Sequence, residues 1–240
     1  MNSYIESLFE LIYPEKNICC ICDIYDEAIG EKYICKDCEM KIKKITPPYC
    51  IKCSKPINHA SDVDLCVECF NHEKYFEASR SPYSCDGIIK KCIGDFKYYN
   101  KPYLLRFLGS SLLRYMQSIN YVNFDYILSV PLHSSKMKKR GYNQSELLAR
   151  YIACKLNIEY FDALKRIKKT EKQSSNSKLN RSINIINAFS IKNNRKYNAI
   201  KNSSILLVDD IYTTGSTVNE CTKVLLNYGV KNVYVITVAR

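Results

Sequence analysis

Two adjacent aspartates close the apolar run of ILLVDDIYTTGST, residues 205–217, and a cluster of hydroxyl side chains follows them. The carboxylates of Asp209 and Asp210 can accept hydrogen bonds from the vicinal diol of a ribose. The next residues would place backbone N–H groups at a helix N-terminus, where the helix dipole favours an anion such as phosphate. These loop residues are Thr213, Thr214, Gly215, Ser216 and Thr217. A site that binds a diol through its aspartates and a phosphate through its loop predicts a 5-phosphoribosyl group as the ligand.

Two commoner phosphate-binding motifs are absent from the sequence. Its seven glycines spell neither G-x-G-x-x-G nor G-x-x-x-x-G-K, which excludes the dinucleotide fingerprint and the P-loop as motifs. A strand, a turn and a capped helix without a ligand would also use these hydroxyl residues, because Ser and Thr cap helices well. That alternative leaves the paired aspartates unexplained, so we favour a ligand site.

Eight of the 13 cysteines form four C-x-x-C pairs. Twelve residues separate the first pair from the second and the third from the fourth, so residues 19–38 and 50–69 are two copies of one unit. Two such pairs supply the four thiolates of a tetrahedral zinc site. The repeat favours one structural Zn²⁺ per copy, and a cross-braced pairing of the first pair with the third is the alternative. The predicted ligands are Cys19, Cys22, Cys35, Cys38, Cys50, Cys53, Cys66 and Cys69.

The other cysteines and the nearby histidines lack a comparable spacing. Cys20 lies inside the first pair, and we interpret it as a bystander. His59 and His72 flank the second unit, whose four cysteines already complete a site, so we expect both on the surface. The remaining cysteines lie in apolar patterns that predict core positions. They are Cys85, Cys92, Cys154 and Cys221.

Nothing in the sequence predicts export or a membrane span. Residues 1–14, MNSYIESLFELIYP, lack the basic segment of a signal peptide and have the spacing of a short amphipathic helix that stops at Pro14. No apolar run approaches the ~18–20 residues that a spanning helix needs. Because disulfides are rare in the reducing cytosol, thiolates held by zinc also fit that compartment. We therefore expect a cytoplasmic protein.

Charge divides the chain into two parts. Residues 1–78 carry 9 Lys and Arg against 14 Asp and Glu, a balance of −5, whereas residues 79–240 carry 27 against 10, a balance of +17. We predict two domains, residues 1–75 with the N-terminal helix and the zinc units, and residues 76–240. The acidic zinc units are expected to dock a partner or cap the second domain, and the basic part attracts polyanions.

Strand and helix patterns alternate in the basic part. A strand or hairpin is predicted at 74–84, buried strands at 126–130, 204–208 and 232–239, and helices at 86–100, 103–116, 143–156 and 216–228. This alternation is typical of an α/β fold, a parallel sheet with helices on both faces. Ligands bind such sheets beyond the carboxyl ends of the strands, where Asp209 and Asp210 would meet the loop of Pro131, Leu132 and His133.

Taken together, these motifs resemble the ComF family, bacterial phosphoribosyltransferase-like proteins linked to DNA uptake. LLVDDIYTTGST is similar to the signature of the type I phosphoribosyltransferases. The likeness spans nearly the whole chain: the C-x-x-C units, FKYYN at 96–100, VPLHSSKMKKRGYNQSELLAR at 130–150, RIKKTEKQSSNSKLNRSINIINAF at 166–189, and VITVAR. It implies a parallel-sheet type I phosphoribosyltransferase fold preceded by a small double zinc-ribbon domain, with 5-phosphoribosyl-1-pyrophosphate and Mg²⁺ as ligands.

The resemblance also implies roles at the acid pair and at the pyrophosphate end. Asp209 and Asp210 would hold the ribose hydroxyls with Mg²⁺, while the TTGST loop holds the 5′-phosphate. The backbone amides around Pro131 and Leu132 would meet the pyrophosphate, and the Arg140 guanidinium would bind its oxygens. Lys136, Lys138 and Lys139 either join Arg140 there or form a solvated basic face.

A basic segment at residues 163–201, with 11 Lys and Arg and one acid, corresponds to a hood that closes over the substrate. Arg181 is the position we expect to reach the ligand there, with Gln173 and Asn184 as further family-matching positions. Three residues depart from the family pattern in the two basic loops and weaken the likeness there. They are Ser134, Asn176 and Asn180.

Two functions follow from these features. The first is a Mg²⁺-dependent phosphoribosyltransferase, in which pyrophosphate leaves the anomeric carbon and an unidentified acceptor takes the phosphoribosyl group. The alternative is a non-enzymatic factor that senses phosphoribosyl pyrophosphate and handles single-stranded DNA, whose phosphates and bases suit the basic, tyrosine-rich second part. Protein partners in DNA uptake would dock on the zinc ribbons in either case.

Overall fold

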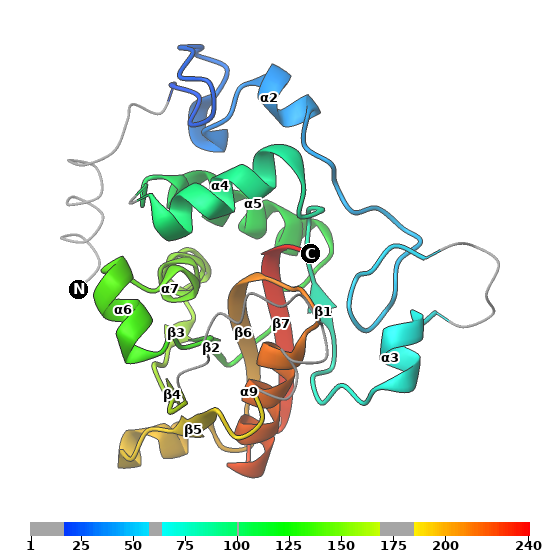
Figure 1. Cartoon of the computed structure of the whole chain (residues 1–240), viewed down its shortest axis with the longest axis vertical. Coiled ribbons are helices and arrows are strands. Elements are labelled where there is room, and N and C mark those ends of the chain that lie inside the picture. The colour runs from blue at the N-terminus through cyan, green and yellow to red at the C-terminus, as the bar shows by residue number, and fades with distance from the viewer. Residues whose placement is uncertain (1–16, 58–63, 100, 169–184) are drawn as a thin grey trace.

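The computed structural model describes residues 17–57, 64–99, 101–168 and 185–240 (Figure 1). The expected N-terminal helix lies outside these residues, as do His59, Gln173, Arg181 and Asn184. The strands are β1 (Ser79–Arg80), β2 (Tyr126–Ser129), β3 (Glu159–Tyr160), β4 (Leu164–Arg166), β5 (Phe189–Ile191), β6 (Ser204–Ile211) and β7 (Asn232–Ala239). The helices are α2 (Lys36–Met40), α3 (Val67–Asn71), α4 (Gly87–Tyr98), α5 (Leu104–Ser118), α6 (Ser134–Arg140), α7 (Gln144–Leu156) and α9 (Ser216–Asn227), with 3-10 turns η1 (Gly30–Lys32) and η2 (Arg195–Ile200).

A five-stranded sheet in the order β1-β7-β6-β2-β3 forms the centre of the molecule, and all its strand pairs are parallel. The parallel sheet predicted from the alternating pattern is therefore confirmed. The segment at 74–84 contributes only the two-residue strand β1, which pairs with β7 and not with a hairpin partner. Strands β4 and β5 form a separate antiparallel pair within the basic segment at residues 163–201.

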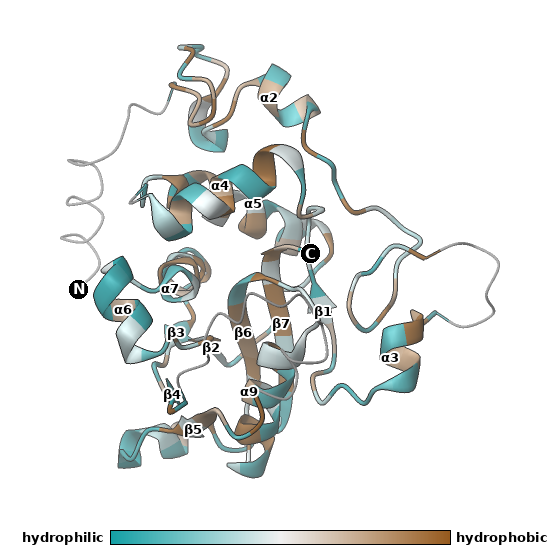
Figure 2. Ribbon diagram, in the orientation of Figure 1, coloured by the Kyte–Doolittle hydropathy of each residue, from teal (hydrophilic) through white to brown (hydrophobic). Residues whose placement is uncertain are grey.

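Successive residues of β6 face opposite sides of the sheet, which makes two separate cores. Leu206 and Val208 pack into the core under α4, α5 and α7, whereas Ile205 and Leu207 pack into the core under α9, β4 and β5. All four side chains are completely buried, as expected for a central parallel strand covered by helices on both faces. Figure 2 shows this central strand as a hydrophobic band. Burial on both faces is the reason why its sequence is a continuous apolar run.

Helix ends follow the cap signals in the sequence. The Asn143 side chain caps α7 by accepting from the Ser145 N–H at 3.2 Å. Helix α9 ends before Gly229, which has φ of 104°, a conformation that glycine adopts without strain. These two helices match their predicted ranges to within a residue at each end. Helix α6 was not expected, because residues 134–140 show no apolar periodicity.

The two cysteine units are copies in structure as well as in sequence. The Cys19 N–H donates to the Ile24 carbonyl at 2.9 Å, and the Cys50 N–H donates to the Lys55 carbonyl at 2.7 Å. These bonds are 31 positions apart (19 to 50, 24 to 55), and α2 and α3 each begin after the third cysteine of their unit. The first unit packs into the core of α4, α5 and α7, and the second into the core of α9 (Figure 1).

Across the described ranges, none of the helices has both the length and the apolar character that crossing a bilayer requires.

Candidate functional site

Asp210 forms an ion pair with a lysine that comes from the far end of α4. Its Oδ2 lies 2.8 Å from Lys97 Nζ, and the two side chains are 11% and 17% exposed. Asp210 is the penultimate residue of β6, so the pair lies at the carboxyl edge of the sheet, where the sequence predicted the ligand. Lys97 thus places a positive charge inside the predicted site.

Asp209 is held by a different helix. Its Oδ1 accepts from Ser145 Oγ at 2.7 Å and from the Asp210 N–H at 2.9 Å. Burial, followed by the neighbouring Asp210 charge, raises the pKa of Asp209 to about 7. Arg166 of β4 lies within electrostatic range of the same carboxylate, and burial lowers the pKa of that guanidinium. A carboxylate whose charged form is disfavoured in this way is suited to binding a cation or the hydroxyl donors of a sugar.

The hydroxyl-rich loop turns sharply at Gly215. This residue is the N-cap of α9 and has φ of 75°. A Cβ at this position would lie 2.1 Å from the hydroxyl oxygen of the buried Tyr212, so only glycine fits. Thr214 Oγ1 lies 2.9 Å from Ser216 Oγ, and the Thr213 side chain is exposed. The loop therefore presents hydroxyls and helix N-terminal amides on the edge that carries Asp209 and Asp210.

The loop after β2 faces the same edge and is organised by side-chain caps. His133 is the N-cap of α6, with Nδ1 accepting from the Ser135 N–H at 3.2 Å and lying 2.8 Å from Ser135 Oγ. Asn143 Nδ2 donates to the Val130 carbonyl at 3.0 Å, which fixes the start of the loop. Pro131 is buried. His133 thus has a structural role as a cap, the interpretation that usually holds for a histidine in such a place.

Arg140 is oriented by two groups that bring it toward the end of α4. Its guanidinium donates to Gln144 Oε1 at 2.6 Å, and its Cζ lies 4.9 Å from the centre of the Tyr98 ring. Gln144 Nε2 in turn donates to the Phe96 carbonyl at 3.3 Å. The last turn of α4 therefore positions both Arg140 and Lys97. The described residues bring together Asp209, Asp210, the hydroxyl loop and the basic β2–α6 loop along one sheet edge.

The eight predicted cysteine ligands form two clusters. In each cluster the four Sγ atoms lie within 4.8 Å of one another, and the members are Cys19, Cys22, Cys35 and Cys38, and Cys50, Cys53, Cys66 and Cys69. A tetrahedral zinc with Zn–S bonds of about 2.3 Å requires S–S separations of about 3.8 Å. Cys22 and Cys35 are separated by 3.7 Å and Cys53 and Cys66 by 3.6 Å. The clusters therefore fit structural Zn²⁺, and the pairing is sequential, not cross-braced.

The positions predicted for the other cysteines are partly confirmed. Cys92 and Cys221 are buried in the two cores, and Cys85 is half-buried. Cys154 is exposed, so its predicted core position is wrong, because the buried residues of α7 lie on another face of the helix. Cys20 belongs to neither cluster, and His72 is exposed, as expected.

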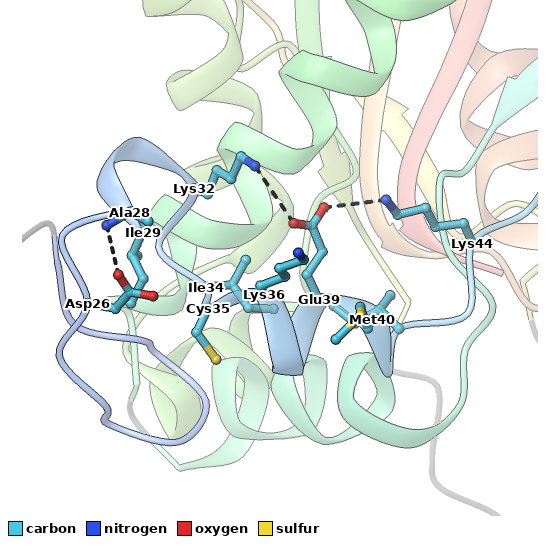
Figure 3. A pocket seen from close by; sticks show the side chains of 11 residues that line it. Asp26, Ala28, Ile29, Lys32, Ile34, Cys35, Lys36, Glu39, Met40 and Lys44 are labelled. Carbon is cyan, nitrogen blue, oxygen red and sulfur yellow. Dashed lines mark hydrogen bonds and ion pairs between the residues drawn. The ribbon is translucent and has the colours of Figure 1, made fainter.

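A cavity of about 600 Å³ lies on the first ribbon, away from these residues (Figure 3). Glu39 crosses it between Lys32, at 4.0 Å, and Lys44, at 3.3 Å. Its lining comes from residues 26–44 alone, with no residue of β6 or of the hydroxyl loop. The cavity is therefore a feature of the first ribbon and not part of the acid-pair site.

Family models match both parts of the chain. Residues 138–240 match the phosphoribosyl transferase domain, and residues 8–70 match the double zinc ribbon domain. The fold and the cysteine clusters thus define a phosphoribosyltransferase-fold protein that carries a double zinc ribbon.

Curated relatives identify the family more closely. Competence protein F of Haemophilus influenzae is 29% identical over 88% of this chain and 92% of its own length. Competence protein ComFC of Bacillus subtilis is 27% identical over 83% of this chain and 80% of its own length. DNA utilization protein YhgH of Salmonella typhi is 27% identical over 87% of this chain and 90% of its own length. Over most of its length the chain is therefore a homologue of these competence and DNA utilization proteins.

Solved structures with a related fold are more distant. Adenine phosphoribosyltransferase from Saccharomyces cerevisiae is 15% identical, with a TM-score of 0.35, over 59% of this chain and 72% of that one. Glutamine phosphoribosylpyrophosphate amidotransferase from B. subtilis is 17% identical, with a TM-score of 0.39, over 59% and 30%. TM-scores below 0.5 add no weight to the site described above.

Sequence reasoning missed three polar residues that contact or face the acid pair: Lys97, Ser145 and Arg166. Lys97 and Ser145 lie within the stretches FKYYN and VPLHSSKMKKRGYNQSELLAR, which carried the family likeness. Their roles depend on how α4 and α7 pack on the sheet. A polar residue next to an apolar helical face is otherwise ordinary.

Proposed function

We propose that the edge formed by β6, α9 and the β2–α6 loop binds 5-phosphoribosyl-1-pyrophosphate and transfers its phosphoribosyl group to an acceptor. The observation that carries this proposal is the acid pair Asp209–Asp210 at the end of β6, followed directly by the glycine turn that begins α9. Carboxylates accept from a diol, and the amides and hydroxyls of residues 213–217 accommodate a phosphate in the field of the helix dipole.

In this proposal, residues of the chain orient the substrate and stabilise charge. Asp209 and Asp210 accept hydrogen bonds from the ribose hydroxyls, and Arg140 with the backbone N–H of Leu132, next to Pro131, binds the pyrophosphate oxygens. The acceptor forms a bond to the anomeric carbon while the bond to the pyrophosphate oxygen breaks, and pyrophosphate leaves with the electron pair. Positioning of the two reactants supplies much of the rate enhancement in such a displacement.

Magnesium is the expected cofactor, and the residues present fit it. Asp209 and Asp210 offer hard oxygen ligands, which Mg²⁺ prefers. When bound, Mg²⁺ would neutralise charge on the leaving pyrophosphate. The raised pKa of Asp209 means that its carboxylate gains from a nearby cation, because a positive charge favours the ionised form.

Calorimetric titration with 5-phosphoribosyl-1-pyrophosphate and Mg²⁺ tests the proposal. We expect micromolar binding by the zinc-loaded wild-type protein and its loss in Asp209→Ala/Asp210→Ala. Asp86→Ala is the matched control, because Asp86 is exposed and makes no side-chain capping bond. No binding by the folded wild-type protein would refute the site. Binding followed by pyrophosphate release with an acceptor would establish turnover.

The non-enzymatic alternative rests on exposed aromatic residues beside the site. Tyr98 and Tyr99 are 59% and 71% exposed, and the basic residues Lys138 and Lys139 lie on the nearby helix α6. Aromatic rings next to cations suit the bases and phosphates of single-stranded DNA. The relatives named for competence and DNA utilization point to a role in DNA uptake, which we extend to this chain. Salt-dependent DNA binding that is lost in Tyr99→Ala but kept in the double aspartate variant would favour this alternative.

Protein partners would have an apolar surface available on the second ribbon. Val67 and Phe70 of α3 are 74% and 70% exposed. We propose docking through this ribbon as an accompaniment to either function. Cross-linking from α3, compared in cells with a Phe70→Ser variant, tests it, and unchanged cross-linking would contradict it.

A further inference from the structure

Arg240 joins the second zinc cluster to the phosphoribosyltransferase domain. Its guanidinium Nη1 donates to Cys53 Sγ and to the Cys53 carbonyl, each at 2.7 Å. Its Cζ also lies 4.9 Å from the centre of the Tyr212 ring, and its side chain is 9% exposed. One buried guanidinium therefore touches both a zinc ligand and the residue that precedes the hydroxyl loop.

Tyr212 carries this contact to the turn itself. Its hydroxyl oxygen lies so close to Gly215 that a Cβ there would be 2.1 Å away. Phe76 also packs on the Tyr212 ring in an edge-to-face arrangement, with 6.2 Å between the ring centroids. The Tyr212 ring thus contacts both Arg240 and the glycine turn, so we expect a shift of the ring to move the loop backbone.

A second contact links the same two regions independently. Asn219, in the first turn of α9, accepts from the Tyr75 N–H at 2.7 Å and donates to the Glu73 carbonyl at 3.2 Å. The Asn219 N–H in turn donates to the Gly215 carbonyl at 2.9 Å. The segment that leaves the second ribbon is therefore fastened to the first turn of α9.

Charge gives the arginine a chemical reason to be there. Four thiolates around Zn²⁺ carry a net charge of −2, and a guanidinium donor to one sulfur offsets part of it. The first cluster has a different attachment, since Arg106 donates to Tyr33 Oη at 3.3 Å and stacks at 5.6 Å on that ring, within the other core. The two zinc sites are thus coupled to different faces of the sheet.

We propose that Arg240 is a positioning residue that couples occupancy of the second zinc site to the conformation of the loop at residues 212–217. Zinc in the second site, and not in the first, holds the loop in its anion-binding form. The nature of the ligand rests on the proposed function, whereas the coupling does not.

Hydrogen exchange and zinc release test the coupling without any ligand. In Arg240→Met we expect two rates to increase about tenfold: amide exchange across residues 212–219, and the loss of zinc from the second site to a chelator. A tenfold change is what the loss of one hydrogen bond to a charged group produces. Arg106→Met is the matched control, and it should accelerate neither. Equal acceleration in both variants, or none in Arg240→Met, would overturn the proposal.

Cobalt replacement supplies a spectroscopic signature that general destabilisation would not produce. Loss of the donor to Cys53 Sγ should shift the thiolate-to-cobalt charge-transfer band to lower energy in Arg240→Met. Arg240→Lys, which keeps the charge but not the planar contact with Tyr212, should restore the band and only part of the exchange protection. An unshifted band in Arg240→Met contradicts the proposal.

Titration of the same variants with 5-phosphoribosyl-1-pyrophosphate separates the two hypotheses. Weaker binding in Arg240→Met than in Arg106→Met supports the coupling and the ligand together. If the wild-type protein fails to bind while the exchange pattern holds, the proposed function fails and the coupling stands. If the two variants differ in amide exchange but bind the ligand with equal affinity, the claim that the coupling serves anion binding is overturned.

Discussion

Lys97 Nζ and Asp210 Oδ2 are 2.8 Å apart, although the two residues come from α4 and β6, elements separated by more than a hundred positions. The lysine charge compensates one acid of the pair while Asp209 is left to Ser145. The two carboxylates are therefore not equivalent. Asp210 forms a direct ion pair, whereas Asp209 accepts a hydrogen bond from a neutral hydroxyl and has Arg166 only within electrostatic range, so the two are suited to different parts of a ligand.

A double-mutant cycle on this pair should reveal a favourable coupling. Lys97→Met leaves a largely buried carboxylate without its cation. We therefore expect the free energy of unfolding to fall by about 1–3 kcal/mol, less than for a completely buried pair. Lys97→Met/Asp210→Asn should recover much of that loss. Lys91→Met on the exposed side of α4 is the control, expected within about 0.5 kcal/mol of wild type. Additive effects in denaturant unfolding would show that the pair contributes no coupling.

Asp209→Asn should stabilise the ligand-free protein, and increasingly so as the pH rises. Because burial raises the pKa of Asp209 from 3.8 to about 7, the charged form costs folding free energy above pH 4, and the cost grows until pH 7. The asparagine oxygen can still accept from Ser145. The full shift would correspond to about 4 kcal/mol, but Asp209 is only half-buried and solvent reduces this cost. We therefore expect the melting temperature of the variant to exceed that of wild type by about 2–4 °C at pH 7.5, about 1 kcal/mol, and by little at pH 4.

Melting curves without Mg²⁺ at the two pH values measure this difference. Asp210→Asn should change stability in the opposite direction at pH 7.5, because it leaves Lys97 without its partner. A lower melting temperature for Asp209→Asn at pH 7.5 would contradict the unfavourable burial of that charge.

Gly215→Ala should damage the hydroxyl loop. The φ of 75° is unfavourable for alanine, and the new Cβ would overlap the Tyr212 hydroxyl, so we expect a loss of about 2–4 kcal/mol together with displaced loop amides. Gly94→Ala in α4 is the control: nothing lies within 4 Å of its added Cβ, and it should gain about 0.5–1 kcal/mol. Unfolding curves and amide spectra measure both, and unperturbed amides at 213–217 in Gly215→Ala would contradict the model of the turn.

Native mass spectrometry should find two Zn²⁺ per chain. Cys19→Ser and Cys50→Ser should each lower the number by one, because each removes a ligand from a separate four-cysteine cluster. In a cross-braced arrangement Cys19 and Cys50 would bind the same ion, whereas the structure places them in separate clusters. Retention of both ions in either variant would show that three thiolates suffice at that site.

The sequence repeat was enough to predict the zinc centres, because the ligand spacing of a knuckle is local and twelve residues separate the pairs in both copies. The strands β2, β6 and β7 were predicted for a related reason, since burial on both faces leaves a continuous apolar run. Lys97 escaped prediction because nothing in α4 alone shows that its last turn reaches β6. Cys154 was misplaced because an apolar neighbourhood does not reveal which face of α7 meets the sheet.

The acid pair and the hydroxyl loop could be predicted as a ligand site from their residue types before their positions in the fold were known. Their types and order predicted an edge of a parallel sheet, and the structure brings Asp209, Asp210 and Gly215 to that edge. Whether they bind the predicted ligand is the question that calorimetry addresses. The hood position Arg181 lies outside the described residues and remains a prediction.

The contact between Arg240 and Cys53 spans 187 positions, which has a consequence for how the protein is made. A ribosome delivers residues 50–69 long before β7, so the second cluster can take up its metal early but must wait for its guanidinium donor. Contacts of such sequence separation close late, because the loop entropy is lost before they can form. A nascent chain would therefore leave the second ribbon's metal without its guanidinium donor until translation reaches Arg240.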